Sequence, residues 1–176
     1  MATTDSDRYD RVAISFHWVI ALLVIANVII GLFHESLFDP RQVMPIHKSI
    51  GMTVLILSIG RLFWRLGHRA PPLPPELPSW EKMAAKAMHG LLYALILLLP
   101  LTGWAMSSDP ERPRPISWFG LFDFPILPTG KAIAGFSHEA HEILGLLMAA
   151  LVVIHIAAAL RHHFLLRDRV LTRMLR

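Results

Sequence analysis

The chain of 176 residues contains no cysteine, and charged residues make up only 17% of it. Without cysteine it cannot form disulfide bonds, hold an iron–sulfur cluster through thiolates, or attach haem through thioether bonds. A metal centre would therefore depend on histidine, of which there are ten. Hydrophobic residues reach 54%, and so high a share with so few charges is typical of a membrane protein and not of a soluble domain.

Four long apolar runs account for this composition. Each is long enough to cross the hydrocarbon core of a bilayer as a helix, which takes about 20 residues. The first run is too long for the core of a signal peptide and no small-residue cleavage site follows it, so we expect it to remain in the protein. The sequence therefore predicts one all-α membrane domain over residues 1–176, a bundle of four transmembrane helices at about 12–33, 46–66, 83–106 and 138–160.

The connections between the runs differ in kind. Residues 70–80 hold five prolines, which favours a stiff, extended connector. Residues 107–134 form the longest loop, rich in proline, glycine and aromatic side chains, and we expect it to lie on the membrane surface or to cover a site. Within the third run, Pro100 should kink the helix without ending it, because the bilayer offers the backbone no other hydrogen-bond partners.

The distribution of Lys and Arg predicts the orientation in the membrane. Of the 17 such residues, twelve fall on the side of the bilayer that holds both termini, including Arg69 and Arg176. Because short cytoplasmic loops carry the excess of positive charge, both termini are predicted to be cytoplasmic. The same topology accounts for the basic character of the chain, so no nucleic-acid partner is expected.

Two histidines organise the last run. His141 and His155 lie fourteen residues apart, which on a helix places them about 21 Å apart along the axis and on one face. Ionisable side chains inside a membrane span are costly and rare, so two on one face indicate metal ligands or a proton path. A structural role, with the imidazoles hydrogen-bonded between helices, is the less favoured alternative.

By depth, the histidines of the four runs form two layers. His47 and His141 lie toward the outer ends of their runs. The cytoplasmic layer holds His17, His89 and His155. A bundle that offers imidazoles from two helices at one level can hold a metalloporphyrin with both axial positions filled. Two layers therefore predict two haems stacked across the bilayer, and on the cytoplasmic side three candidates compete for two positions.

The residues one helical turn after these histidines give a further indication of which histidines bind a haem. A porphyrin that lies against a helix needs a small residue near its ligand. After four of the five histidines the residue four positions on is small, whereas His89 is followed by the bulky Tyr93. The small residues are Ala21, Gly51, Gly145 and Ala159.

Further candidates lie at the cytoplasmic ends of the second and fourth runs. Arg61 and Arg65 are four residues apart and share a helix face. They are candidates to bind haem propionates, or else to meet lipid phosphates. His162 and His163 follow His155 by one to two turns, and either belong to the basic tail or face a bound head group.

Seven short motifs, taken in order, resemble a known family. They are FHW at the start of the first run, IHKSIG and RLFWR at the two ends of the second, the PPLPP connector, HGLLY in the third run, and HEILGLL and IHIAAALRHH in the fourth. Each motif alone is short, but their order and spacing, from about residue 8 to residue 175, are similar to those of the bacterial cytochrome b561 family.

The resemblance implies a four-helix bundle in the bacterial inner membrane with two b-type haems, each held by two histidines. The outer haem would lie between His47 and His141. The inner haem would lie between His17 and His155, which leaves His89 without a ligand role. Some members are similar to the cytochrome subunits of hydrogenases and formate dehydrogenases. One compact branch, which this chain resembles, acts as superoxide oxidase and passes electrons from superoxide to ubiquinone.

That activity would need positive charge at the outer end and protons at the inner end. Superoxide is an anion, and Lys48, directly after His47, could attract it locally. His89, His162 and His163 could relay protons for quinone reduction.

Two other functions stay open. The chain could be an electron-transfer subunit that a protein partner feeds through the loop at 107–134. It could also be a histidine-rich metal transporter or a structural bundle. A cation path would need acidic residues within the spans, however, and almost none lie there beyond Glu142 near one outer end.

Overall fold

The computed structural model describes residues 8–68, 70–75 and 77–175. Four long helices form a bundle: α1 (Arg11–Phe33), α2 (Pro40–Gly67), α3 (Ser79–Ser107) and α4 (Lys131–Leu160). Each is long and apolar enough to cross a membrane, so the all-α prediction with four such helices is confirmed. Arg69 and Arg176, which entered the charge count above, lie outside the described residues.

Three of the helices begin earlier than the apolar runs predicted. α2 begins at Pro40 and not near Ile46. There the Asp39 carboxylate accepts a hydrogen bond from the Arg41 N–H (2.9 Å), and proline fits the first turn of a helix. α3 and α4 begin with turns that include charged residues, Glu81 and Lys82 in α3 and Lys131 in α4, and a search for continuous apolar runs leaves these turns out. The loop expected at 107–134 is therefore shorter.

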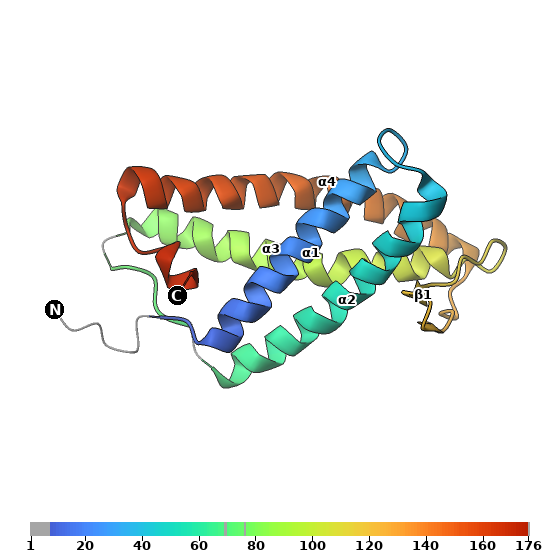
Figure 1. Cartoon of the computed structure of the whole chain (residues 1–176), viewed down its shortest axis with the longest axis horizontal. Helices are drawn as coiled ribbons and strands as arrows, with labels where there is room; N and C mark the ends of the chain where they lie inside the picture. Colours follow the sequence, from blue (N-terminus) through green and yellow to red (C-terminus); the bar gives the residue numbers. More distant parts are fainter. Residues whose placement is uncertain (1–7, 69, 76, 176) are drawn as a thin grey trace.

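The helices pack as two antiparallel pairs, α1 with α2 and α3 with α4, and α1 closes the bundle against α4 (Figure 1). α3 continues through Pro100, so the prediction that this proline does not end the helix is confirmed. A short antiparallel hairpin of β1 (Ser117–Trp118) and β2 (Phe122–Asp123) lies at one end of the bundle, and the C-terminus lies at the other. We call these the hairpin end and the terminal end.

An apolar layer fills the middle of the bundle. All four helices contribute to it, through Ile20, Val24, Val54, Ile96 and Met148. Many large apolar side chains also cover the outside of the helices. A water-soluble protein rarely exposes so many large apolar side chains together. This outer surface therefore suits contact with lipid.

The loop between α3 and α4 is fastened along α2. Ile116 of the loop is buried against Met52 and Leu55. The Ser49 hydroxyl accepts a hydrogen bond from the Phe119 N–H (3.0 Å). The loop is thus held over the hairpin end of the bundle.

The segment after α4 folds back. A single π-helical turn (Arg161–Leu166) and the left-handed Arg167 (φ 53°) reverse the chain before a short 3₁₀ turn (Thr172–Met174). The Trp18 indole N–H then donates to the Met174 carbonyl (2.6 Å). This contact ties the tail to α1 at the terminal end.

Asp10 joins the start of α1 to the end of α2. Its carboxylate accepts hydrogen bonds from the Ala13 N–H (2.8 Å), as an N-cap, and from the Trp64 indole N–H (3.1 Å). Desolvation by itself would raise the pKa of Asp10, but these hydrogen bonds and the nearby His68 lower it below its usual value. The ionised carboxylate is therefore the form that stabilises this corner of the bundle.

Removing this cap should loosen the corner. We expect Asp10→Ala to lower the free energy of unfolding by about 1 kcal/mol, the usual cost of losing a side-chain N-cap, and Asp10→Asn, which keeps a capping oxygen, to lower it less. Because the pKa of Asp10 is lowered in the folded protein, its stabilisation should be present at neutral pH and lost as the pH falls through that pKa. Thermal unfolding of the detergent-solubilised protein at several pH values measures both effects. Equal stability of all three proteins at neutral pH would contradict the assignment.

Candidate functional site

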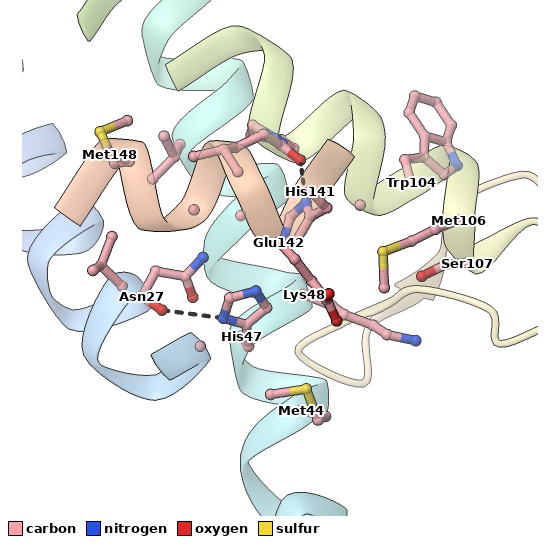
Figure 2. A pocket seen from close by; sticks show the side chains of 18 of the residues that line it. Asn27, Met44, His47, Lys48, Trp104, Met106, Ser107, His141, Glu142 and Met148 are labelled. Atoms are coloured by element: carbon pink, nitrogen blue, oxygen red, sulfur yellow. Dashed lines mark hydrogen bonds between the residues drawn. The ribbon is translucent and has the colours of Figure 1, made fainter. Parts of the chain in front are cut away.

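Two histidines face each other at the hairpin end. His47 of α2 and His141 of α4 have their ring centroids 6.1 Å apart, and both line a cavity of about 600 Å³ (Figure 2). That volume is usual for a ligand or cofactor site. All four helices contribute to the wall, which is mostly apolar and includes Gly51 and Gly145. The outer-layer residues of the sequence analysis thus line one cavity.

Each of the two rings is held by one nitrogen. His47 Nδ1 donates to the carbonyl oxygen of Asn27 in α1 (3.2 Å). In the same way, His141 Nδ1 donates to the carbonyl oxygen of Leu99 in α3 (3.0 Å). A carbonyl oxygen only accepts, so each Nδ1 carries the proton and each Nε2 keeps its lone pair. This is the arrangement in which a histidine binds a metal through Nε2.

Glycine makes both contacts possible. A Cβ at Gly31 of α1 would lie 3.1 Å from His47 Cε1, and a Cβ at Gly103 of α3 would lie 3.2 Å from His141 Cε1. Each glycine follows by four residues the carbonyl that its histidine binds, so the imidazole reaches that carbonyl over bare backbone. The sequence analysis missed both glycines. A signal was present in the sequence: each glycine lies on a neighbouring helix at about the same depth in the bundle as the candidate ligand that it contacts.

The site at the hairpin end, named the outer site here after the outer layer predicted from the sequence, fits a metal ion within a flat macrocycle. With metal–nitrogen bonds of about 2 Å, two imidazoles on opposite sides of one ion have centroids about 6.3 Å apart. The observed spacing of His47 and His141 is 6.1 Å. A flat ring also needs space beside its ligands, and a Cβ added at Gly145 would meet nothing within 4 Å. The donor set and the space beside it therefore suit a porphyrin with two histidine ligands.

A second histidine group lies at the terminal end. The ring centroid of His155 in α4 is 6.5 Å from that of His17 in α1 and 5.6 Å from that of His89 in α3. His17 and His155 are half-buried, whereas His89 is exposed. The structure thus brings together the three histidines that competed for two ligand positions.

Arg61 reaches into this group from α2. Its Nη1 lies 3.3 Å from His17 Nδ1. The guanidinium carbons of Arg61 and Arg65 lie 5.4 and 6.0 Å from the ring centroid of Tyr93, so both arginines pack on that ring. The two candidates for binding propionates therefore differ, since Arg61 contacts a histidine and Arg65 is more exposed.

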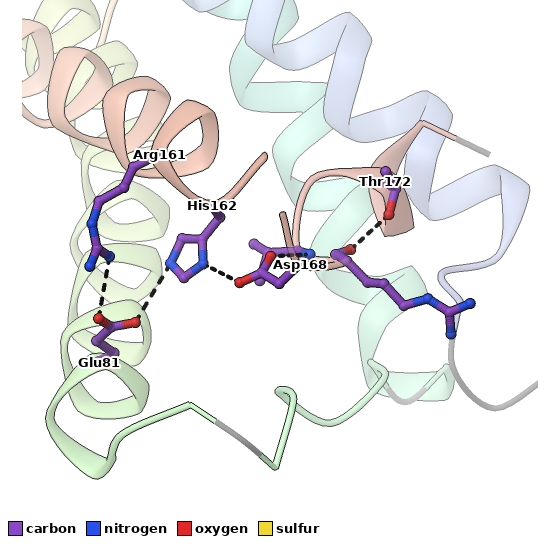
Figure 3. Close-up of polar contacts among 7 residues, drawn as sticks. Glu81, Arg161, His162, Asp168 and Thr172 are labelled. Atoms are coloured by element: carbon purple, nitrogen blue, oxygen red, sulfur yellow. Dashed lines mark hydrogen bonds and ion pairs between the residues drawn. The ribbon is translucent and has the colours of Figure 1, made fainter. Parts of the chain in front are cut away.

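The remaining histidine candidates lie beyond α4. His162 is held between two carboxylates, with Nδ1 hydrogen-bonded to Asp168 and Nε2 3.8 Å from Glu81 (Figure 3). Arg161 also pairs with Glu81 (3.3 Å). His163 instead packs against the ring of the next residue. The structure therefore separates two histidines that the sequence analysis grouped, and gives His162 the acidic partners.

Lys48 lies at the rim of the outer cavity. Its ammonium group donates a hydrogen bond to the Arg114 carbonyl of the covering loop (2.9 Å), and both residues line the cavity together with Glu142. Lys131, by contrast, is paired with Glu111 (2.8 Å). Positive charge near the cavity is therefore concentrated at Lys48 and Arg114.

A comparison of the whole chain with protein families adds to this geometry. Residues 8–176 match the family described as prokaryotic cytochrome b561. The chain belongs to the prokaryotic cytochrome b561 family. The resemblance inferred from the seven motifs is thereby confirmed. Members of the cytochrome b561 family are membrane proteins that bind b-type haem and transfer electrons.

Three relatives cover almost the whole chain. Cytochrome b561 homolog 2 of Escherichia coli (strain K12) is 34% identical over 181 residues, which is 98% of this chain and 94% of the relative. The probable superoxide oxidase CybB of Yersinia pestis is 30% identical, with 96% of each chain covered. Cytochrome b562 of Cereibacter sphaeroides is also 30% identical, with 98% of each chain covered. The similarity to other b-type cytochromes thus extends over both histidine groups.

Filling the space beside the outer histidines should displace haem. We expect Gly145→Leu to reduce the haem bound per chain, because its side chain would enter the outer cavity. Gly135→Leu is the matched control, since a Cβ there also meets nothing within 4 Å but the residue does not line the cavity. Both changes replace a helical glycine of α4, so their effects on helix propensity are alike. Quantifying extracted haem against protein measures the difference. Equal haem in the two variants would contradict this position for the macrocycle.

Proposed function

We propose that the chain is a dihaem cytochrome b that oxidises superoxide at the outer face of the membrane and passes the electrons to ubiquinone, a superoxide:ubiquinone oxidoreductase. The observation that carries this proposal is a pair of facing imidazoles at each end of the bundle, with centroid spacings of 6.1 and 6.5 Å. The name of the Yersinia pestis relative, a probable superoxide oxidase, supports the choice of electron donor.

Each pair would bind one haem through Nε2. His47 and His141 are the proposed outer ligands, and His17 and His155 the inner ones. The distance between His17 and His155, 6.5 Å, is close to the spacing of about 6.3 Å across a metal ion. The distance between His89 and His155 is shorter, at 5.6 Å, which favours His17 as the ligand. When bound, haem supplies a centre that accepts and donates one electron at a time.

The neighbouring residues shape the two sites. Gly51 and Gly145 line the outer cavity and leave room for a macrocycle. Arg114 and the rest of the covering loop close that cavity from the hairpin end. Arg65, one turn beyond Arg61 on the same face, is suited to pair with a propionate at the inner site.

Both termini are proposed to be cytoplasmic, in the inner membrane of a bacterium. Twelve of the 17 Lys and Arg residues fall on that side in this topology, as the positive-inside rule requires. The hairpin end and its cavity then face outward. Superoxide formed outside the cell membrane would meet the outer site first.

Lys48 is the residue suited to attract superoxide. It is half-buried at the cavity rim, where the Arg114 carbonyl accepts a hydrogen bond from its ammonium group. Positive charge at the mouth of an apolar cavity raises the local concentration of a small anion. Because Lys131 is paired with Glu111, this attraction is local and not spread over the outer surface.

Quinone reduction takes up protons with the electrons, and we assign three histidines to their supply. His89 lies beside the inner pair and is exposed on the bundle. His162 lies between Glu81 and Asp168 and can carry a proton on either ring nitrogen. His163 follows on the same turn, near the place where protons would enter from the cytoplasm.

A second candidate function is that of an electron-transfer subunit fed by a protein partner. The observation that favours it is the apolar tip of the hairpin, where Phe119 is 53% exposed, Leu121 73% and Phe122 51%. An exposed apolar tip suits a partner surface. The names of the Escherichia coli and Cereibacter sphaeroides relatives specify no electron donor.

Haem counting tests the ligand assignment. Wild-type protein should bind two haems per chain. His47→Ala and His141→Ala should each lose the outer haem and keep the inner one, because an apolar layer separates the sites. His89→Ala should keep both haems. So should the control His68→Ala, whose ring bonds to the Trp64 carbonyl one turn earlier (3.0 Å) and does not line the cavity. Two haems in both outer-ligand variants would contradict the assignment.

Reduction by superoxide tests the activity. Oxidised protein should develop reduced b-haem bands while superoxide is generated enzymatically, and the bands should decay faster with ubiquinone. Lys48→Gln should slow this reduction by up to about tenfold and leave reduction by dithionite unchanged. Lys131→Gln, the same change in net charge outside the cavity lining, should behave as wild type. Bands that form with dithionite but not with superoxide would favour the partner-fed subunit, and a protein without haem would exclude both functions.

A further inference from the structure

We infer that the hairpin of β1 and β2 is a membrane anchor, whose exposed apolar tip inserts between the lipids at the hairpin end of the bundle. The tip consists of Phe119, Leu121 and Phe122. The inference rests on the contacts of the hairpin and on helices that can span a membrane. It is independent of the number of haems, the electron donor and the electron acceptor. It assigns to lipid the surface that a protein partner would otherwise contact.

The hairpin lies beside α2 and not beyond the ends of the helices (Figure 1). The Trp118 indole N–H donates a hydrogen bond to the Thr53 hydroxyl (3.0 Å), near the midpoint of α2. Thr53 follows Ile46, where the second apolar run begins, by seven residues, which is about 10 Å along the helix. An amphipathic helix at a membrane surface buries its apolar side to a similar depth, about 5–10 Å. The contact with α2 therefore holds the hairpin at the depth of the membrane interface.

The face of α2 that holds the hairpin is also a lipid-facing surface. Ser49 and Thr53 bond to the hairpin, and their spacing places Ile46 and Ile56 on the same helix face. Both isoleucines are exposed, one before and one after the hairpin contact. Because exposed apolar side chains on a membrane-spanning helix contact lipid, the apolar tip continues this surface away from α2.

The polar groups of the hairpin are largely satisfied within the protein. The buried Ser49 hydroxyl accepts a hydrogen bond from the Phe119 N–H (3.0 Å) and donates to the Ser117 carbonyl (3.0 Å). Ser117 pairs with Asp123 across the two strands. Asp123 is at the base of the hairpin, and the five residues at 118–122 carry no charge. Insertion of the tip therefore removes few unpaired polar groups from water.

The backbone conformation of Phe119 is a second observation that favours lipid contact. Phe119 (φ 49°) and Gly120 (φ 75°) are both left-handed, in a turn closed by the Leu121 N–H and the Trp118 carbonyl (2.9 Å). Such a turn favours Asn, Asp or Gly at its first position, and a bulky residue there is strained. The Phe119 ring contacts Trp118 but stays half exposed. Burial of this ring among lipids would offset the strain, since aromatic side chains are stable at the membrane interface.

Spin labelling in liposomes tests this inference, because the chain has no cysteine and one can be added at a chosen position. Leu121→Cys would carry a nitroxide in the full-length, haem-loaded protein, reconstituted in phosphatidylcholine and phosphatidylglycerol. Oxygen concentrates in lipid, whereas a neutral nickel chelate stays in water. The ratio of oxygen to nickel accessibility should be several-fold higher at Leu121 than at the control Arg112→Cys. Arg112 is exposed in the charged stretch of the same loop. Ile56→Cys, on the lipid-facing side of α2, should give a ratio at least as high as Leu121→Cys.

Two results would overturn the inference. A ratio at Leu121 equal to that at Arg112 would place the tip in water, where it is free to contact a protein partner. Low accessibility to both reagents would show that protein, such as a second copy of the chain, covers the tip. Phe122→Cys is the second labelled position if Leu121→Cys does not retain haem, and the same ratio is expected there. Neither result depends on reduction by superoxide, so this inference and the proposed function can fail separately.

Discussion

The structure depends on satisfying the polar nitrogens of histidine inside an apolar slab. A helix in a bilayer uses its backbone groups for its own hydrogen bonds, so a buried imidazole N–H has few acceptors within reach. His47 and His141 each donate their Nδ1 proton to a backbone carbonyl of a neighbouring helix, which that carbonyl accepts in addition to its role in the helix. This leaves Nε2 of each ring able to bind a metal. The carbonyl is accessible because the residue one turn later has no side chain, and this is the role of Gly31 and Gly103.

The same contacts explain why the bundle is built from two antiparallel pairs. The first pair supplies His47 from α2, proposed above as a ligand, and its acceptor Asn27 from α1. The second supplies His141 from α4 and its acceptor Leu99 from α3. Each pair therefore carries a complete half of the outer site, with the ring already oriented. Packing one pair on the other brings the two imidazole rings to 6.1 Å from each other in the cavity, and the loop fastened at Ser49 then covers it.

Spacing along one helix was sufficient to predict part of this site. The bilayer imposes the length of an apolar run, so the four helices could be read from the sequence, and fourteen residues place His141 and His155 on one face. The start of α2 was missed because the Asp39 cap and Pro40 decide it, and apolar side chains do not. Gly31 was missed because its role exists only in a contact between helices. Residue spacing alone left the inner ligands open for the same reason, because His17 and His89 share a depth and differ in lateral distance from His155. The family resemblance was needed to favour His17.

The two ends of the bundle use different chemistry around similar imidazoles, and the apolar layer between them keeps this difference local. Neutral carbonyls hold the outer rings, whereas the terminal end carries Arg61 against a ring and Glu81 between two basic groups. Met148, buried in the middle layer, lies seven residues from both His141 and His155. Over the resulting separation of about 21 Å the interaction between charges is several-fold weaker than it is at contact. A cation beside one ring therefore acts mainly on the groups at its own end of the bundle.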